Sequence, residues 1–123
     1  MTHINLTYLN LKTFTEQNIS DYCQINNINH EDITSLYLNN NDLTDISEIK
    51  LFKNLKHLYI DNNKITDISV IRYLKNIEIL NITYLQLESD QIQYIKNLKI
   101  LFCFIGFKDI NTVNQFNNIN IIK

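Results

Sequence analysis

The side chains suited to catalysis or metal binding are dispersed along the chain rather than gathered in motifs. None of the histidines and cysteines has the spacing of a zinc site. These residues are His3, Cys23, His30, His57 and Cys103. The single glycine, Gly106, excludes a glycine-rich loop that holds a phosphate. The sequence therefore predicts no metal site and no cofactor.

The nearest approach to a catalytic pair is His57 with Asp61. On one strand, residues four apart lie about 13 Å from each other, which is too far for a hydrogen-bonded dyad. Three aspartates, Asp45, Asp67 and Asp109, suggest an acidic cluster. However, they recur at one position of the repeat described below, where a short polar side chain caps a turn. We therefore expect a non-enzymatic protein.

Composition limits the remaining classes of function. The 123 residues suffice for a single domain, 45% of them are hydrophobic, and 20% are charged. The net charge of −2 gives no electrostatic reason to expect binding to nucleic acid or to a membrane. The 22 Ile and 20 Asn residues, with no Ala and no Pro, predict an AT-rich genome such as that of a virus, a bacterium or a protist.

The N-terminal residues lack the basic start, the apolar run and the cleavage site of a secretory signal. No run of about 18 apolar residues suggests a transmembrane helix. We therefore expect a cytoplasmic protein, located in the host cytoplasm if the source is a virus. The two cysteines are then expected to be reduced.

An internal repeat with a period of 22 residues is the most informative feature. The segment LTDISEIKLFKNLKHL (43–58) aligns with ITDISVIRYLKNIEIL (65–80). Two further units continue the apolar pattern at a period of 21 residues, and Ile122 is expected to begin another. Upstream, Leu6, Leu9 and Leu11 copy the spacing within the later units, which predicts a longer first unit whose strand contains Leu9 and Leu11.

The repeat reads L-x-x-L-x-L-x-x-N-x-L followed by T-D-I-x-x-I, and it resembles the leucine-rich repeat family. The resemblance is to the 22-residue class found in internalin-like bacterial proteins and phosphatase-regulatory subunits. It implies an α/β solenoid, right-handed and curved, with five units, a concave parallel sheet and short 3₁₀ or helical segments on the convex side. In that family the Asn, here Asn41 and Asn63, binds open backbone groups of the turn. We expect Phe14, Leu85 and Gly106 to replace it in the other units.

The single domain, 1–123, is expected to begin with a cap-like first unit, 1–32. It contains a helix at about 16–25, with Thr15 as the N-cap and with Phe14 and Ile19 at the spacing of a hydrophobic staple. Four repeats of 21–22 residues follow over 33–119, and 120–123 begin a further strand. Cys23 and Cys103 would lie about 19 Å apart across four strand spacings, so both are expected to be buried thiols.

Residues between the inward leucines should form three columns across the concave face. The first is Tyr8, Ser35, His57, Ile79, Ile100; the second is Asn10, Tyr37, Tyr59, Asn81, Phe102; the third is Lys12, Asn39, Asp61, Thr83, Phe104. The later units present large apolar residues, which exceed what a monomer usually exposes. A partner, a second copy or the chain's own C-terminus covers them, or they are simply exposed, or the register of the fifth unit differs.

We therefore predict a protein-binding module that uses the concave face. Tyr37, Tyr59 and Phe102 are the expected anchors, because aromatic residues dominate binding hot spots. The predicted binding residues are Tyr37, His57, Tyr59, Asp61, Ile79, Asn81, Ile100, Phe102 and Phe104. The alternative is a structural protein that self-associates through its apolar C-terminal end, for example as a homodimer. Residues 120–123 could instead pair as a sixth short strand.

Overall fold

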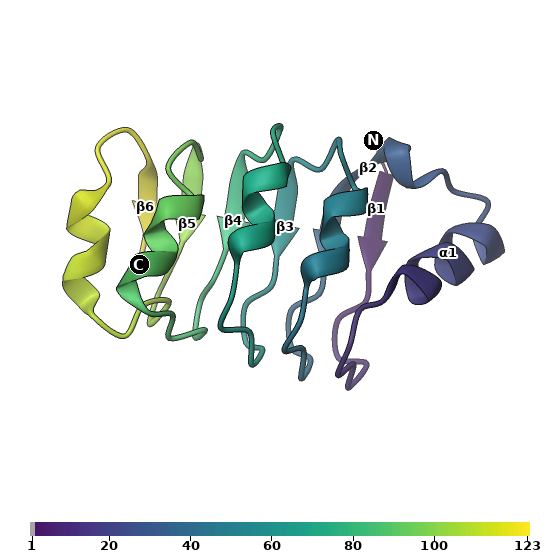
Figure 1. Ribbon diagram of the computed structural model, residues 1–123, viewed down its shortest axis with the longest axis horizontal. Coiled ribbons are helices and arrows are strands. Elements are labelled where there is room, and N and C mark those ends of the chain that lie inside the picture. The colour runs from purple at the N-terminus through teal and green to yellow at the C-terminus, as the bar shows by residue number, and fades with distance from the viewer. Residues whose placement is uncertain (1) are drawn as a thin grey trace.

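The computed structural model describes residues 2–123, and it consists of one parallel sheet with helical segments along one side (Figure 1). The strands are β1 (Thr2–Asn5), β2 (Ile33–Tyr37), β3 (His57–Tyr59), β4 (Ile79–Asn81), β5 (Ile100–Phe102) and β6 (Asn120–Ile122). Each strand pairs with the next one along the chain, in the order β1-β2-β3-β4-β5-β6. Every turn of the chain therefore adds one strand, which confirms the predicted solenoid.

Short 3₁₀ helices return the chain from the end of one strand to the start of the next. They are η1 (His30–Asp32), η2 (Ser47–Leu51), η3 (Ser69–Tyr73), η4 (Ser89–Tyr94) and η5 (Ile110–Gln115). The apolar spacing of three explains this geometry, because residues i and i+3 of a 3₁₀ helix lie on one edge. Around η2, Ile46, Ile49 and Phe52 are all buried, as that spacing predicts.

The core is a continuous apolar layer between the sheet and the 3₁₀ helices. Leu36, Leu58, Leu80 and Leu101 face it from successive strands, and each is completely buried. Burying such a side chain contributes about 1.5–3 kcal/mol. Since each unit supplies only part of this layer, neighbouring units stabilise one another.

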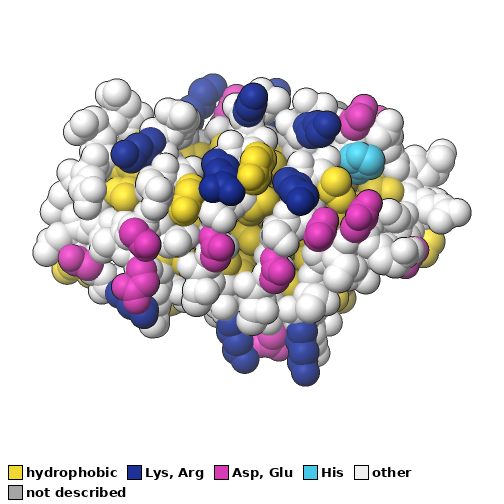
Figure 2. Space-filling view, in the orientation of Figure 1, with side chains coloured by type: hydrophobic (Ala, Val, Ile, Leu, Met, Phe, Trp, Pro, Cys, Tyr) yellow, Lys and Arg dark blue, Asp and Glu magenta, His cyan; other side chains and the backbone are white. Residues whose placement is uncertain are grey.

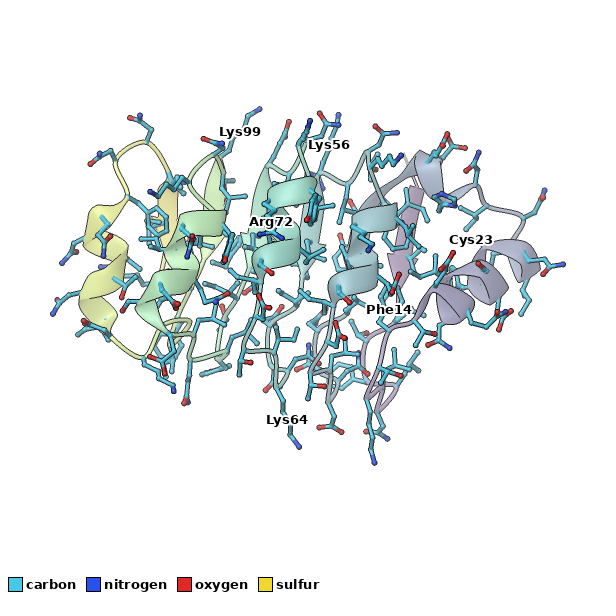
Figure 3. All side chains as sticks on the ribbon, in the orientation of Figure 1. Phe14, Cys23, Lys56, Lys64, Arg72 and Lys99 are labelled. Carbon is cyan, nitrogen blue, oxygen red and sulfur yellow. The ribbon has the colours of Figure 1, made fainter. Side chains whose placement is uncertain are left out.

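Helix α1 (Glu16–Ile25) lies beyond β1 at the N-terminal end of the sheet, and it matches the predicted helix (Figure 1). The backbone N–H of Asn18 donates to Thr15 Oγ1, and the Thr15 N–H donates to Asn18 Oδ1, at 3.2 Å each. Ile19 and Cys23 are buried, and Figure 3 shows Cys23 on this helix. The helix thereby covers the apolar edge of the first unit.

The register predicted for the first strand is wrong. In the sheet, Ile4 lies opposite Leu36, and β1 ends at Asn5. Leu9, predicted to point inward, is 53% exposed in the turn after β1. A bridge between Thr13 and Asp45 supports the observed register. The pattern Ile4-x-Leu6 matches Leu36-x-Leu38, whereas the similar spacing of Leu6, Leu9 and Leu11 is coincidental.

This register also changes which residue replaces the family's Asn in the first unit. Leu9, rather than Phe14, occupies the position of Asn41. Phe14 instead corresponds to Ile46 and is buried, with its ring 6.2 Å from that of Phe52. Its ring is therefore part of the hydrophobic core rather than of the turn.

At the C-terminal end, β6 pairs with β5, as the sixth-strand alternative predicted. Ile121 rather than Ile122 takes the inward position, because Ile121 lies opposite Leu101. Ile122 lies opposite Phe102 on the other face. The unit before β6 is therefore shorter than the pattern predicted.

Cys23 and Cys103 are both buried and form no disulfide, which confirms the prediction of free thiols. Burial raises the pKa of each thiol. Among residues 2–123, no helix is long and apolar enough to cross a membrane.

Candidate protein-binding face

The concave face is the side of the sheet opposite the 3₁₀ helices, and strand register fixes its side chains in columns. The observed first column is His3, Ser35, His57, Ile79, Ile100 and Asn120; the second is Asn5, Tyr37, Tyr59, Asn81, Phe102 and Ile122. The predicted columns are therefore right from β2 to β5. They are wrong for Tyr8, Asn10 and Lys12, which follow β1 in a turn. Tyr8 and Asn10 have positive φ angles of 57° and 54°.

Tyr37 and Tyr59 stack on this face as their column position predicts. Their ring centroids are 4.6 Å apart and the rings are nearly parallel, with an angle of 4° between their planes. His3 meets the Tyr37 ring edge-on at 6.3 Å. Burial raises the pKa of Tyr59, and nearby Tyr37 and Asp61 raise it further. The Tyr59 hydroxyl therefore stays neutral, and its half-buried ring offers both an aromatic surface and a hydrogen-bonding group.

Ser35 Oγ and His57 Nδ1 form a hydrogen bond, 3.0 Å long, that the sequence pattern did not predict. The indication in the sequence was that these two polar residues occupy outward strand positions one repeat period, 22 residues, apart. Ser35 is completely buried, so its hydroxyl cannot reach a substrate. We conclude that Ser35 orients the His57 ring and that the pair is not a catalytic dyad. The described residues show no hydrogen bond between His57 and Asp61.

Asp61 follows β3 and is half-buried on the concave face. Its Oδ1 is covered and has no hydrogen-bond partner, and the same is true of Asn39 Oδ1 in the preceding unit. Desolvation raises the pKa of the Asp61 carboxyl, although a bond from its own backbone N–H partly offsets the effect. Two acceptor oxygens without donors therefore lie at the same repeat position of neighbouring units.

The apolar part of the face is placed as predicted. Ile79, Ile100 and Phe102 are half-buried, and Phe104 is 49% exposed. The Tyr84 ring meets the Phe104 ring edge-on at 5.5 Å, which adds an aromatic residue that the sequence did not indicate. Tyr84 lies at the turn position that Asn40 and Asn62 hold in the two preceding units, and a large aromatic residue in place of asparagine there was the available indication.

Asn41 and Asn63 have the structural role that the resemblance implied. Asn41 Oδ1 accepts hydrogen bonds from the N–H groups of Leu9 and Leu11, at 3.0 and 3.1 Å. Its Nδ2 donates to the carbonyl oxygens of Leu6 and Leu38. In the next unit, Asn63 Oδ1 accepts from the N–H of Leu43, and its Nδ2 donates to the carbonyl oxygens of Leu38 and Ile60. These side chains hold consecutive turns together, so their role is structural.

The three recurring aspartates cap turns, as predicted. Asp45, Asp67 and Asp109 each accept a hydrogen bond at 2.8–2.9 Å from the backbone N–H two residues later. These bonds lower the pKa of Asp45. Within residues 2–123, no group of three His, Cys, Asp or Glu side chains converges as a metal site would require.

The sequence matches a family model described as leucine rich repeats (2 copies), over residues 31–73 and 53–95. These two matches together cover more than half of the chain. A comparison with curated protein sequences finds no match.

Solved structures of leucine-rich proteins share this fold. Internalin C2 from Listeria monocytogenes aligns with a TM-score of 0.68 and 20% identity over 98% of this chain and 50% of that one. Another internalin from the same organism, inlF, aligns with a TM-score of 0.50 and 22% identity over 74% of this chain and 34% of that one. The chain therefore spans at most half the length of these internalins. The family matches and the shared solenoid show that the chain belongs to the leucine-rich repeat family.

Proposed function

We propose that the chain is a non-enzymatic module that binds a partner protein on its concave face. Leucine-rich repeat proteins generally mediate protein–protein interactions. The observation that carries the proposal is the continuous surface formed by the stacked Tyr37 and Tyr59 and the half-buried Ile79, Ile100 and Phe102. Buried aromatic anchors with a few polar neighbours are the usual composition of a binding hot spot.

The surface is also pre-organised for binding. Parallel pairing fixes each strand, and the Tyr37 and Tyr59 rings restrain one another. The bond from Ser35 restrains the His57 ring. Little conformational entropy is therefore lost when a partner docks, which improves affinity without additional contacts.

The test begins with affinity purification from a lysate of the source cells or their host, followed by mass spectrometry. The identified protein is then titrated calorimetrically against wild type and a Tyr59→Ala, Phe102→Ala variant. We expect the variant to bind at least about tenfold more weakly, since truncating hot-spot aromatics costs more than about 1.4 kcal/mol. Tyr73→Ala on the convex side is the control, because Tyr73 is 53% exposed and lies outside the proposed face. Equal affinities for all three proteins would contradict the proposal.

A second candidate function is self-association near β5 and β6. An apolar hollow of about 340 Å³ lies there, lined by residues that include Cys103, Phe104, Phe107 and Val113. Ile110, at the same hollow, is 79% exposed. A second copy that inserts apolar side chains into this hollow would form a homodimer, which is usually two-fold symmetric.

Sedimentation equilibrium distinguishes the two candidates. Self-association predicts a dimer at tens of micromolar that a Phe104→Asp, Ile110→Asp variant converts to a monomer. A wild-type protein that stays monomeric at this concentration would contradict the second candidate and leave the first unaffected.

A further inference from the structure

The corrected register of the first unit changes the charge of the concave face. The predicted columns contained Lys12 and Asp61, one charge of each sign. In the structure Lys12 lies in the turn beyond β1, and the strand positions are taken by His3 and Asn5. Among the column residues that the structure describes, Asp61 alone carries a formal charge at neutral pH, with histidine neutral.

The basic side chains are placed elsewhere on the molecule. Figure 2 shows Lys and Arg spread over the face that carries the 3₁₀ helices. Lys56 and Lys99 lie at the edge where strands begin, and Lys64 lies at the opposite edge (Figure 3). Lys64 pairs with Asp42 at 3.7 Å. Within residues 2–123, no cationic side chain forms an ion pair with Asp61.

One oxygen of the Asp61 carboxylate has no hydrogen-bond donor. Asp61 Oδ1 and Asn39 Oδ1 are both covered and unpartnered, and neighbouring strands place their backbones about 4.8 Å apart. The terminal torsion of a carboxylate is broad, so a small rotation presents either oxygen to a ligand. Tyr59 lies close enough for its pKa to respond to the Asp61 charge. The site thus offers a carboxylate with one negative charge beside an aromatic pair, and the covered Asn39 oxygen lies at the neighbouring repeat position.

We infer that this site, formed by Asn39, Tyr59 and Asp61, binds an arginine side chain of the partner protein. A guanidinium carries five N–H donors in a planar fork, so one group can donate two bonds to the Asp61 carboxylate. Its charge is attracted to the carboxylate and to the face of a tyrosine ring. The inference rests on the proposed function, because it names what a partner presents to the same face.

A random dodecapeptide library displayed on phage tests the inference without a known partner. The library is selected against wild type, and the enriched peptides are titrated against Asp61→Asn, Asp67→Asn and Tyr59→Ala. Asp67→Asn changes the net charge equally on the convex side, and its amide oxygen still accepts the bond that Ser69 N–H donates. Circular dichroism verifies that every variant is folded.

We expect arginine to be enriched at one peptide position and Asp61→Asn to weaken binding at least about tenfold, since charge-assisted bonds are the stronger class. Asp67→Asn should leave affinity unchanged. Enriched peptides without arginine, or peptides that bind Asp61→Asn as well as wild type, would overturn the inference. If such peptides still require Tyr59, only the inference fails. If the library yields no binder, or binding also survives Tyr59→Ala, the proposed function fails with it.

Discussion

One turn position of the repeat requires a left-handed backbone, and the chain fills it unevenly. The φ angles of Asn40, Asn62, Tyr84 and Ile105 at this position are 60°, 54°, 66° and 50°. Asparagine tolerates this conformation, whereas a β-branched residue is strained in it. Tyr8 takes the corresponding position of the first unit, with a φ angle of 57°. Ile105 is the β-branched residue at this position, so its backbone strain is the largest.

Replacing Ile105 with asparagine should stabilise the protein. Relief of the left-handed conformation contributes about 1 kcal/mol, and Ile105 is 43% exposed, so little packing is lost. The reverse change, Asn62→Ile, should destabilise by a similar amount. Urea denaturation measures both. A loss of stability in Ile105→Asn would show that burial of this side chain matters more than its backbone strain.

The Asp61 carboxyl contributes a pH dependence to the free energy of unfolding, and an asparagine at this position would remove that contribution. Its folded-state pKa is raised by desolvation, so its relative contribution to stability is greatest below the ordinary carboxyl pKa. That contribution is lost as pH rises through the raised pKa. We expect Asp61→Asn to be at least as stable as wild type at pH 7 and to lose this advantage at about pH 3.

Denaturation midpoints measured from pH 3 to pH 7 test this expectation, with Asp45→Asn as the opposite case. The Asp45 pKa is lowered by the Ser47 N–H, so its contribution is present above the ordinary pKa and lost at lower pH. An Asp61→Asn protein that is less stable than wild type at pH 7 would mean that the folded protein stabilises the Asp61 carboxylate more than burial destabilises it.

At the scale of the elements, asparagine side chains join consecutive turns. Asn41→Ala should lower the free energy of unfolding by about 2–4 kcal/mol, because several backbone groups lose their partners at once. Asn76→Ala should change it by less than about 0.5 kcal/mol, since Asn76 is exposed and makes one long bond of 3.4 Å. Urea denaturation compares the two. Similar losses would remove the special role assigned to Asn41.

The elements from β2 to β5 could be predicted from the sequence because the 22-residue period fixes their register. Leu58 and Leu80 are placed as expected, and so is the Tyr37–Tyr59 stack. The first strand could not be placed in this way. Both Ile4-x-Leu6 and Leu9-x-Leu11 have the alternating apolar pattern of a strand. The pairing with β2 shows that the segment containing Ile4 forms β1.

The sequence predicted where the candidate site lies, but not which contacts its side chains make. Strand alternation places Asp61 on the concave face, yet it does not show that one carboxylate oxygen, Oδ1, is covered and lacks a donor. Likewise, alternation places Ser35 and His57 in one column, but only side-chain packing buries the serine and forms their bond. Such features depend on rotamers and on neighbouring units, which a single repeat pattern does not specify.

At the scale of the whole molecule, stability depends on packing between units. Leu58→Ala should lower the free energy of unfolding by about 2–5 kcal/mol, because Leu58 is completely buried in the middle of the sheet. Ile25→Ala is the matched control, since Ile25 is 82% exposed at the end of α1, and it should change stability by less than about 0.5 kcal/mol. Equal effects, measured by chemical denaturation, would contradict the inward register.

The 3₁₀ helices and α1 cover the core of the solenoid, while the sheet leaves the concave face open. Isoleucine methyl groups report on the two sides separately. Ile79 and Ile100 lie on the concave face, whereas Ile25 and Ile110 are exposed on helical segments. Core residues such as Ile46 serve as internal references, since a docked partner does not reach them.

The most direct test of concave-face binding is therefore a methyl NMR titration of isoleucine-labelled protein with its purified partner. We predict that the Ile79 and Ile100 signals shift or broaden while those of Ile25, Ile46 and Ile110 stay in place. Changes confined to Ile25 and Ile110, with Ile79 and Ile100 unaffected, would contradict the assignment of the concave face as the binding surface.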